Sequence, residues 1–372
     1  MVKLGTVISQ AKNIRCGEHN YPVLSMTMHD GLIFQDDKFK KVIASANRSE
    51  YKVVYRNQLV VSFPIDEGVL AAQRITDVGI VSPAYTIWDI DQAKILPEFL
   101  EYALRCDRSI NYYKAKLRGS TARRRSLPTP TLLEHTIPLP AIDAQRYILE
   151  IIHKSRNVLE TRKIQLQKLD MLVRARFVEM FGDPVLNEKG WKIVTVGDIV
   201  TEVRYGTSKP AVEGGKYPYL RMNNLTADGH LDLKDLKYID ISEDEIEKCV
   251  VRKGDVLFNR TNSIELVGKT AVFDLTEEMV IAGYIIRVRL NKEMLPVVFS
   301  QYMNLEPLKV ILRGMAKGAV NQANINAQEL QSIKVYIPDM KLQNQFADFV
   351  QQIDKSKLQY HPHTHTCQPN TS

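Results

Sequence analysis

The chain contains 372 residues, of which 44% are hydrophobic and 25% are charged, a composition normal for a folded globular protein and unlike that of a disordered one. Its length suits two or three domains. Its net charge of +7 favours an anionic partner, and nucleic acid is the most common partner of that kind.

The cysteines and the first residues bear on where the protein works. Cys16, Cys106, Cys249 and Cys367 are too widely spaced for a zinc ribbon or a redox pair, so we expect free thiols in a reducing compartment. The first residues lack the pattern of a signal peptide, and no apolar run is long enough to cross a bilayer. We therefore expect a cytoplasmic protein.

Residues 1–142 predict an α+β domain. Residues 53–63 (VVYRNQLVVSF) contain two apolar runs separated by turn-forming residues, which is typical of strand, turn and strand. Residues 97–105 (PEFLEYALR) have helical periodicity. Residues 137–140 (IPLP) predict a short closing strand that is ended by proline.

A basic segment near the end of this domain is a candidate for contacts with nucleic acid. Residues 105–125 hold eight arginines and lysines against one acid. Both cations neutralise phosphates, and arginine can also donate two hydrogen bonds to guanine. A solvent-exposed charged face with no ligand is the alternative. The predicted DNA-contacting residues of the first domain are Arg118, Ser120, Arg123, Arg124 and Arg125.

Residues 143–181 contain neither glycine nor proline and predict one long helix. About 38 residues, from Asp143 to Met180, would make a rod of roughly 57 Å at 1.5 Å per residue. Residues at alternating spacings of four and three have the pattern of a coiled coil: Ile148, Ile152, Ser155, Leu159, Arg162, Leu166, Leu169 and Val173. A single amphipathic helix on a globular core is the alternative. The residues expected to bind a partner are Leu159, Leu166, Leu169 and Val173.

Residues 182–340 repeat the first domain. Matches between the two parts keep one order at an offset of roughly 192–200 residues, which indicates duplication of a whole domain. The sequence 21–24 (YPVL) corresponds to 217–220 (YPYL), the prolines Pro97 and Pro296 each precede an apolar-rich stretch, and Gln145 corresponds to Gln343. We therefore expect a second α+β domain of the same kind.

Three segments of the second domain, residues 221–224, 258–263 and 317–324, are candidates for reading DNA. Residues 258–263 (FNRTNS) follow a predicted strand and are rich in hydrogen-bond donors, although a turn with no ligand is an equal alternative. Residues 317–324 correspond to the basic segment but carry amides, which suit adenine. The candidate residues are Arg221, Asn223, Asn259, Arg260, Lys317, Asn321, Gln322 and Asn324.

The sequence lacks the motifs of several common classes of enzyme. Residues 268–270 (GKT) resemble the end of a phosphate loop, but Ser263 stands where its first glycine is needed. There is no Asn-Pro-Pro-aromatic or Asp-Pro-Pro-aromatic motif of an amino-methyltransferase, no HExxH and no GxSxG. We expect no catalytic centre and no metal site.

A second helical pattern covers residues 341–359 and is about half as long as the first. The apolar stripe of the first helix beyond about Leu166 therefore needs another cover. The polar tail 360–372 is predicted to be disordered, so His361, His363, His365 and Cys367 are not expected to bind a metal.

Four strings resemble a recognition domain of type I restriction–modification specificity subunits: GDVLFNRTNS (254–263), LVGKTAVF (266–273), IAGYIIRVR (281–289) and KGAVNQANIN (317–326). Residues 177–184 (FVEMFGDP), with Gly190 and Trp191, resemble that family's link between its central helix and second domain. The resemblance covers nearly the whole chain. It is strong in the second domain and weaker in the first.

The resemblance implies a fold of two tandem target-recognition domains, 1–142 and 182–340, separated by long helices that form an antiparallel coiled coil. Each domain would read half of a bipartite site in double-stranded DNA. The helices would act as a spacer and dock two methyltransferase (M) subunits, and restriction (R) subunits would be added for cleavage. S-adenosylmethionine, ATP and magnesium would belong to those partners, with no cofactor in this chain. The family's second helix usually equals the first in length, so a shortened form with altered docking is expected.

Two other functions remain open. A coiled-coil scaffold with two protein-binding domains would need no basic loop. A specificity subunit of another restriction enzyme type would have the same sequence features, and the neighbouring genes would separate these two types.

Overall fold

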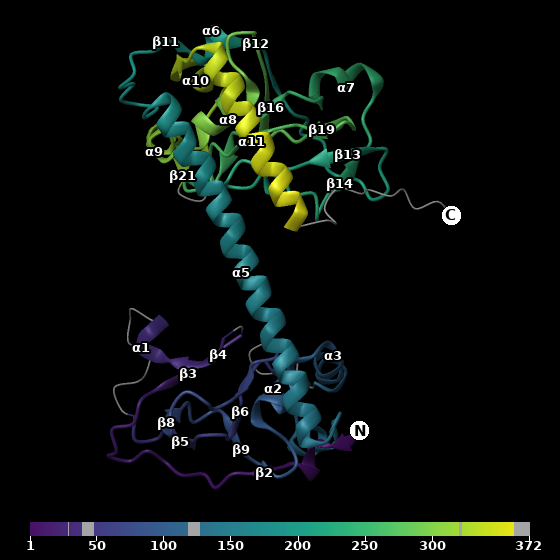
Figure 1. Cartoon of the computed structure of the whole chain (residues 1–372). Coiled ribbons are helices and arrows are strands. Elements are labelled where there is room, and N and C mark those ends of the chain that lie inside the picture. Colours follow the sequence, from purple (N-terminus) through teal and green to yellow (C-terminus); the bar gives the residue numbers. More distant parts are fainter. Residues whose placement is uncertain (29, 39–47, 118–126, 320–321, 361–372) are drawn as a thin grey trace. The chain divides into compact units, whose positions relative to one another are not determined.

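The computed structural model describes residues 1–28, 30–38, 48–117, 127–319 and 322–360 (Figure 1). The chain divides into two compact units, Met1–Leu159 and Glu160–Ser372, and the division falls inside one long helix. Each unit contains both helices and strands, which confirms the α+β class. Among the described residues, no helix combines the length and apolarity that crossing a membrane requires.

The first unit begins with strands and ends with helices. Its elements are β1 (Val2–Lys3), η1 (Leu4–Thr6), β2 (Ile8–Gln10), β3 (Leu24–Thr27), β4 (Gly31–Phe34), α1 (Gln35–Lys38), β5 (Lys52–Tyr55), β6 (Leu59–Val61), η2 (Ile65–Glu67), β7 (Leu70–Ala72), β8 (Val78–Val81), β9 (Thr86–Ile90), α2 (Pro97–Arg105), α3 (Asp107–Lys116), α4 (Thr129–Glu134), β10 (Thr136–Ile137) and the start of α5 (Ile142–Phe181).

The second unit continues from α5 through β11 (Lys192–Thr195), α6 (Val196–Ile199), β12 (Val200–Tyr205), β13 (Tyr217–Leu220), η4 (Met222–Asn224), β14 (Lys237–Ile239), α7 (Glu243–Cys249), β15 (Val250–Val251), β16 (Val256–Asn259), β17 (Thr261–Asn262), β18 (Thr270–Val272), β19 (Met279–Ile281), β20 (Ile285–Leu290), α8 (Pro296–Asn304), α9 (Glu306–Met315), β21 (Lys317–Ala319), β22 (Gln322–Asn324), α10 (Ala327–Ser332), β23 (Lys334–Ile337) and α11 (Met340–Tyr360).

The main sheets of the two units have the same topology: corresponding strands are neighbours in the same spatial order. In the first unit the order is β2-β9-β6-β7, and in the second it is β12-β20-β16-β18. In each unit the first strand pairs antiparallel with the closing strand, β1 with β10 and β11 with β23. This correspondence is what a duplicated domain predicts.

The two predicted strands in residues 53–63 lie in different sheets. β5 pairs with β8, whereas β6 pairs with β7 and β9. The second unit repeats this, since β15 pairs with β19 and β16 pairs with β18 and β20. The turn between each pair of strands therefore carries the chain from one sheet to another. Periodicity alone cannot distinguish this from a hairpin, because both arrangements alternate apolar and polar residues.

Helix α5 contributes to the cores of both units. Leu149 belongs to the first core, and Val173, Phe177 and Phe181 belong to the second. The stripe beyond Leu166, expected to need another cover, is thus covered by the second unit's own core. The helix begins one residue before the predicted range, at Ile142, and ends at its predicted last residue, Phe181.

Helix α11 packs antiparallel against the last turns of α5 (Figure 1). Near the start of α11, the Phe346 ring centroid lies 5.4 Å from that of Phe177 and 5.5 Å from that of Phe181. Near its end, the Lys357 ammonium lies 2.6 Å from Asp170 Oδ1. The start of α11 thus contacts the end of α5, and the end of α11 contacts an earlier turn of α5, so the two helices are antiparallel.

A buried glutamine fixes the start of each long helix. The Gln145 side-chain amide donates to the carbonyls of Lys94 (2.9 Å) and Pro140 (2.8 Å), and its oxygen accepts from the Leu96 amide (2.9 Å). Gln343 is also fully buried and makes the matching bonds to Glu293, Pro338 and Leu295, each of 2.9 Å. The glutamine thus ties the helix to the segment just before α2 or α8.

Replacing Gln343 with leucine should destabilise the second unit. The change removes the partners of one backbone amide and two carbonyls, and a buried polar group without a partner costs about 1–3 kcal/mol. We expect a loss of about 3 kcal/mol in the free energy of unfolding, measured by urea denaturation. Gln345→Leu, the same change at an exposed position of α11, should alter it by less than about 0.5 kcal/mol. Equal effects of the two substitutions would contradict a structural role for the Gln343 amide.

Candidate nucleic-acid interface

Two candidate segments of the second unit, far apart in the sequence, are joined in one small sheet. β17 pairs antiparallel with β22, so that Thr261 lies opposite Asn324, and β22 pairs with β21. The Ile325 amide also donates to the Arg260 carbonyl at 2.9 Å. The loop after β16 and the amide-rich segment therefore form one surface element.

The side chains of this element have different exposures. Gln322 and Lys317 are exposed, and the Lys317 ammonium lies 2.6 Å from Glu329 Oε1. Asn324 is partly buried and accepts a hydrogen bond from the Thr261 hydroxyl at 3.3 Å. Asn321, predicted with them, lies outside the described residues.

Asn259, predicted to contact DNA, is fully buried. Its side-chain amide donates to the carbonyls of Thr261 and Tyr284, each at 3.1 Å, and its oxygen accepts from the Asn262 side chain at 2.8 Å. These bonds use its polar atoms within the protein. Asn259 therefore shapes the loop from inside and does not offer its amide to a ligand in this structure.

A cavity of about 570 Å³ lies beside this element and collects three of the predicted residues. Arg221, Asn223 and Arg260 all line it, as does Lys209. The other lining residues are Thr207, Ser208, Pro210, Ala211, Tyr219, Met222, Ala282, Gly283 and Tyr284. The described lining thus contains three cationic side chains and no carboxylate, which gives it a positive character.

Two of the three cations are paired with acids outside the cavity lining. Arg221 Nη2 donates to Asp235 Oδ2 at 2.7 Å, and the Lys209 ammonium pairs with Glu245. The Arg260 guanidinium instead lies over the Tyr205 ring, 5.0 Å from its centroid, and donates to the Gly283 carbonyl at 3.4 Å. Arg260 has no carboxylate partner among the described residues.

The Nε atoms of Arg221 and Arg260 are both buried without a hydrogen-bond acceptor in the described structure. A buried donor without an acceptor costs about 1–3 kcal/mol, so most folded proteins avoid it. An acceptor from a ligand could reach either atom if its guanidinium turned towards the cavity. This pair of unsatisfied donors marks the cavity as a place for an oxygen-bearing ligand.

The predicted contacts of the first domain fall outside the described residues. This applies to Arg118, Ser120, Arg123, Arg124 and Arg125. Two aromatic residues just before them are used for packing. Tyr113 is fully buried, and the Tyr112 ring stacks on His135 with centroids 4.4 Å apart. These two tyrosines therefore support the fold of the first unit.

The four residues expected to bind a partner differ in accessibility. Leu159 is 71% exposed, whereas Leu166 and Leu169 are partly buried. Val173 is only 7% exposed because it packs in the second core, so the expectation that it meets a partner needs correction. Leu159 is thus the most accessible of the four.

The resemblance to a phosphate loop at residues 268–270 has a structural explanation. The Lys269 side chain is buried, and its ammonium donates to the carbonyls of Met222 (2.8 Å) and Leu225 (2.5 Å). Gly268 has a φ of +79°, and an added Cβ would lie 2.6 Å from Leu312 Cδ1. The lysine holds η4 in place, and the glycine permits a tight approach by α9.

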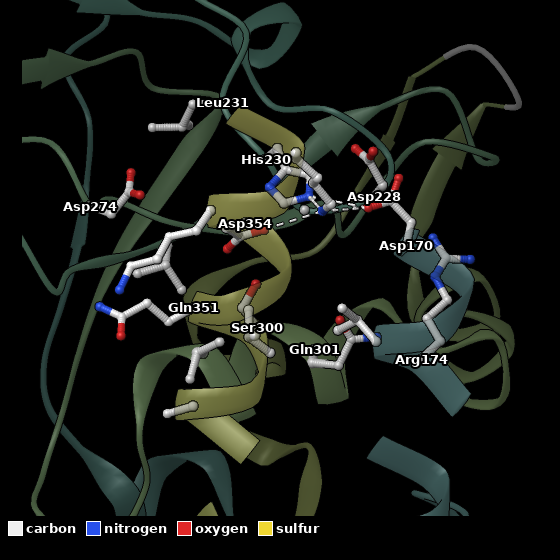
Figure 2. A pocket seen from close by; sticks show the side chains of 18 residues that line it. Asp170, Arg174, Asp228, His230, Leu231, Asp274, Ser300, Gln301, Gln351 and Asp354 are labelled. Carbon is white, nitrogen blue, oxygen red and sulfur yellow. Dashed lines mark hydrogen bonds and ion pairs between the residues drawn. The ribbon is translucent and has the colours of Figure 1, made fainter. Parts of the chain in front are cut away.

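A second cavity, of about 390 Å³, lies within the second unit and has a mixed charge (Figure 2). Figure 2 shows Asp170 and Arg174 of α5, Asp354 of α11 and the loop residues Asp228 and His230 around it. Lys357 Nζ lies 2.6 Å from Asp170 Oδ1 and 3.1 Å from His230 Nε2. This lysine thus connects both helices with the loop.

One group of three residues in this cavity has the spacing of metal ligands. Ligand atoms of Asp170, Asp228 and His230 all lie within 4.8 Å of one another. The Lys357 ammonium already lies against two of the three residues, so a metal ion would have to displace it. The geometry is therefore that of an internal ion-pair network.

The network shifts the pKa values of its members. Contact with Asp170 raises the pKa of His230 above 6.5, against the smaller opposing effects of burial and Lys357. Burial alone would raise the pKa of Asp170, but His230 and Lys357 together outweigh it and lower that pKa. Both shifts favour the charged forms of the acid and the imidazole.

Sequence reasoning did not identify several residues that shape these sites. Tyr205 and Tyr284 lie far from Arg260 in the sequence, and nothing local marks them as its neighbours. The cluster of Asp170, His230 and Lys357 comes from three separate segments. Its only local signal is that charged residues stand near the apolar stripe of each helix.

Comparison with known proteins gives one family match. Residues 188–363 match the family model of the type I restriction modification DNA specificity domain. The matched segment includes β11 to α11 and therefore all three candidate segments of the second domain and the positive cavity.

A characterised relative is similar over a larger part of the chain. The chain is 26% identical over 233 residues to the type I restriction enzyme EcoKI specificity subunit of Escherichia coli (strain K12), which covers 58% of this chain and 50% of that protein. The matched part thus spans half the length of that relative.

Two solved structures share the fold. One, from a study of complex assembly and conformational transition of the type I R-M system, has a TM-score of 0.57 and 18% identity, covering 98% of this chain and 92% of that one. The Type-I restriction-modification system S subunit from M. genitalium has a TM-score of 0.50 and 15% identity, covering 98% and 91%. At these identities the likeness concerns the fold.

The pKa of His230 gives a test of the ion-pair network. A raised pKa in the folded state means that the charged imidazole stabilises the fold at low pH, and this contribution is lost as pH rises through the raised value. We expect the stability difference between the wild type and His230→Gln to shrink from pH 6 to pH 8.

NMR titration can check the cause of this shift. The pKa of His230 should lie above 6.5 and fall in Asp170→Asn, because the acid that raises it is then neutral. His135 provides an internal control, since burial lowers its pKa and Asp170→Asn should leave its titration unchanged. An unchanged His230 titration in Asp170→Asn would contradict the network.

Proposed function

Because residues 188–363 match the family model of the type I restriction modification DNA specificity domain, we propose that this chain is the DNA-binding specificity subunit of such a system. The observation that carries the proposal is the joining of β17 with β22 beside a cavity lined by cations and no described carboxylate. Basic and amide side chains from distant segments meet there, and these are the groups that bind phosphates and base edges.

The two units would each read half of a bipartite target. Their common strand order, β2-β9-β6-β7 and β12-β20-β16-β18, supports this division. Their candidate contacts differ in chemistry, with arginines in residues 118–125 and amides in residues 321–324. Arginine suits guanine and amides suit adenine, so the half-sites would differ in sequence.

Helices α5 and α11 would form the spacer and the dock for the methyltransferase (M) subunits, and the restriction (R) subunits would join the complex for cleavage. Their antiparallel packing, from Phe346 on Phe177 to Lys357 on Asp170, supports a two-helix coiled coil. Leu159 is the most exposed of the apolar residues predicted to bind a partner. Replacement of Leu159 should therefore affect assembly more than folding.

The chemistry of the assembled complex would lie in its other subunits. Adenine methylation with S-adenosylmethionine and DNA cleavage driven by ATP and magnesium would belong to the M and R subunits. This chain would direct those activities to a sequence. The Lys269 ammonium donates to the carbonyls of Met222 and Leu225, so it is not directed at a nucleotide phosphate as the lysine of a phosphate loop would be. This agrees with placing the ATP-dependent chemistry in other subunits.

Salt-dependent binding to a duplex tests the function. We expect the full chain to bind a random-sequence duplex in gel-shift titrations, with log K falling linearly as log salt rises. Replacing Arg123, Arg124 and Arg125 with alanine should lower the magnitude of this slope by up to about 3. Alanine at Lys154, Lys163 and Lys168, exposed on α5, removes equal charge and should leave the slope unchanged.

The alternatives give different results. A coiled-coil scaffold would show no salt-dependent binding to the duplex, even with a methyltransferase subunit added. A specificity subunit of another restriction enzyme type would bind DNA but would assemble with other partners. Methylome sequencing of the host with and without this gene tests the proposed type I function against that of another restriction enzyme type. Loss of a bipartite adenine methylation motif without the gene is the result expected for the type I subunit.

A further inference from the structure

We propose that the positive cavity of the second unit holds one backbone phosphate of the DNA duplex, with Arg260 as its principal ligand. This inference rests on the proposed function and assigns a specific task to one site within it. The cavity is lined by Thr207–Ala211, Tyr219, Arg221–Asn223, Arg260 and residues 282–284, all within the second unit.

The balance of charge indicates a single anionic group. Arg221 is paired with Asp235, and Lys209 is paired with Glu245. Arg260 has no carboxylate partner among the described residues, and no described carboxylate lines the cavity. One uncompensated positive charge therefore faces the cavity, which suits one phosphodiester.

Arg260 is held in place before any ligand arrives. Its backbone amide donates to the Tyr284 carbonyl, and its own carbonyl accepts from the Ile325 amide, each at 2.9 Å. Its guanidinium lies over the Tyr205 ring, whose hydroxyl accepts from the Ala327 amide at 2.8 Å. The fixed backbone keeps the arginine at the cavity, so that only a local rotation of its side chain is needed to bind an anion.

The buried Nε of Arg260 gives an independent sign of a missing ligand. It has no acceptor in the described structure, although Nη1 donates to the Gly283 carbonyl. A turn of the guanidinium towards the cavity would bring Nε and its terminal nitrogens to two oxygens of one phosphate, the paired geometry that arginine prefers. The hydroxyls of Thr207 and Ser208, also in the lining, can supply further donors.

The concave shape favours a phosphate over a base edge. Side chains that read the major groove must project from the protein surface, because base edges lie at the bottom of the groove. Phosphates lie on the outside of the duplex and can enter a cavity. Arg260 would therefore fix the register of the second unit on the duplex and leave sequence reading to the β17–β22 element beside it.

Salt titration of the full chain with a random-sequence duplex tests this role. Arg260→Gln should lower the magnitude of the slope of log K against log salt by about 0.9 and weaken binding about tenfold at 0.1 M salt. Arg260→Lys keeps the charge and should retain the slope. Arg313→Gln makes the same charge change on α9, outside the cavity, at a side chain paired with Glu306, and should alter neither.

A neutral methylphosphonate placed at each backbone position in turn gives a second readout. The duplex carries the target sequence found by selecting bound molecules from a random duplex pool. The substitution at one backbone position should weaken binding by the wild type about tenfold and should have no further effect on binding by Arg260→Gln. Inorganic phosphate should compete only weakly, because it lacks the contacts of the rest of the duplex.

The outcomes separate this inference from the proposed function. No salt-dependent binding by the wild type would overturn the proposed function itself. Wild-type binding with an unchanged slope in a folded Arg260→Gln protein would overturn only the phosphate site. A changed base preference in Arg260→Gln, found by selection from a random duplex pool, would also overturn it, because a phosphate ligand carries no sequence information. Circular dichroism of each variant establishes that it is folded.

Discussion

The buried glutamine at the start of each long helix is the interaction on which the rest of the architecture depends. Gln145 and Gln343 each join three backbone groups that no regular helix or strand bond would satisfy. An amide side chain suits this place, because it alone among uncharged side chains offers two donors and an acceptor at one end. The helix therefore leaves each domain from a fixed point, directly beside α2 or α8.

Local sequence patterns predicted several helices and the repetition of the domain. The helices at 97–105, 143–181 and 341–359 agree with the structure to within one residue at each end. Their periodicity and their proline positions are local signals, so a single sequence contains them. The match of Gln145 with Gln343 also pointed to two equivalent sites, although it could not show which bonds they make.

The candidate site was predictable only in part, because its geometry depends on contacts between distant segments. Arg221 and Asn223 were predicted from one segment and Arg260 from another, and the structure brings all three to one cavity. Asn259, from the same local pattern as Arg260, is buried instead, because it ends the fully buried strand β16, whereas Arg260 lies in the break between β16 and β17. The stacking of Arg260 on Tyr205 has no local signal at all.

The ladder between β17 and β22 limits how the protein can acquire a new target. The two segments share a register, with Thr261 opposite Asn324, so adding or removing one residue in either would turn its following side chains to the other face. Diversification must therefore proceed by exchanging side chains on an unchanged backbone, or by replacing both segments together. Many surface loops tolerate insertions, but an insertion in β17 or β22 would disrupt the pairing of these two strands.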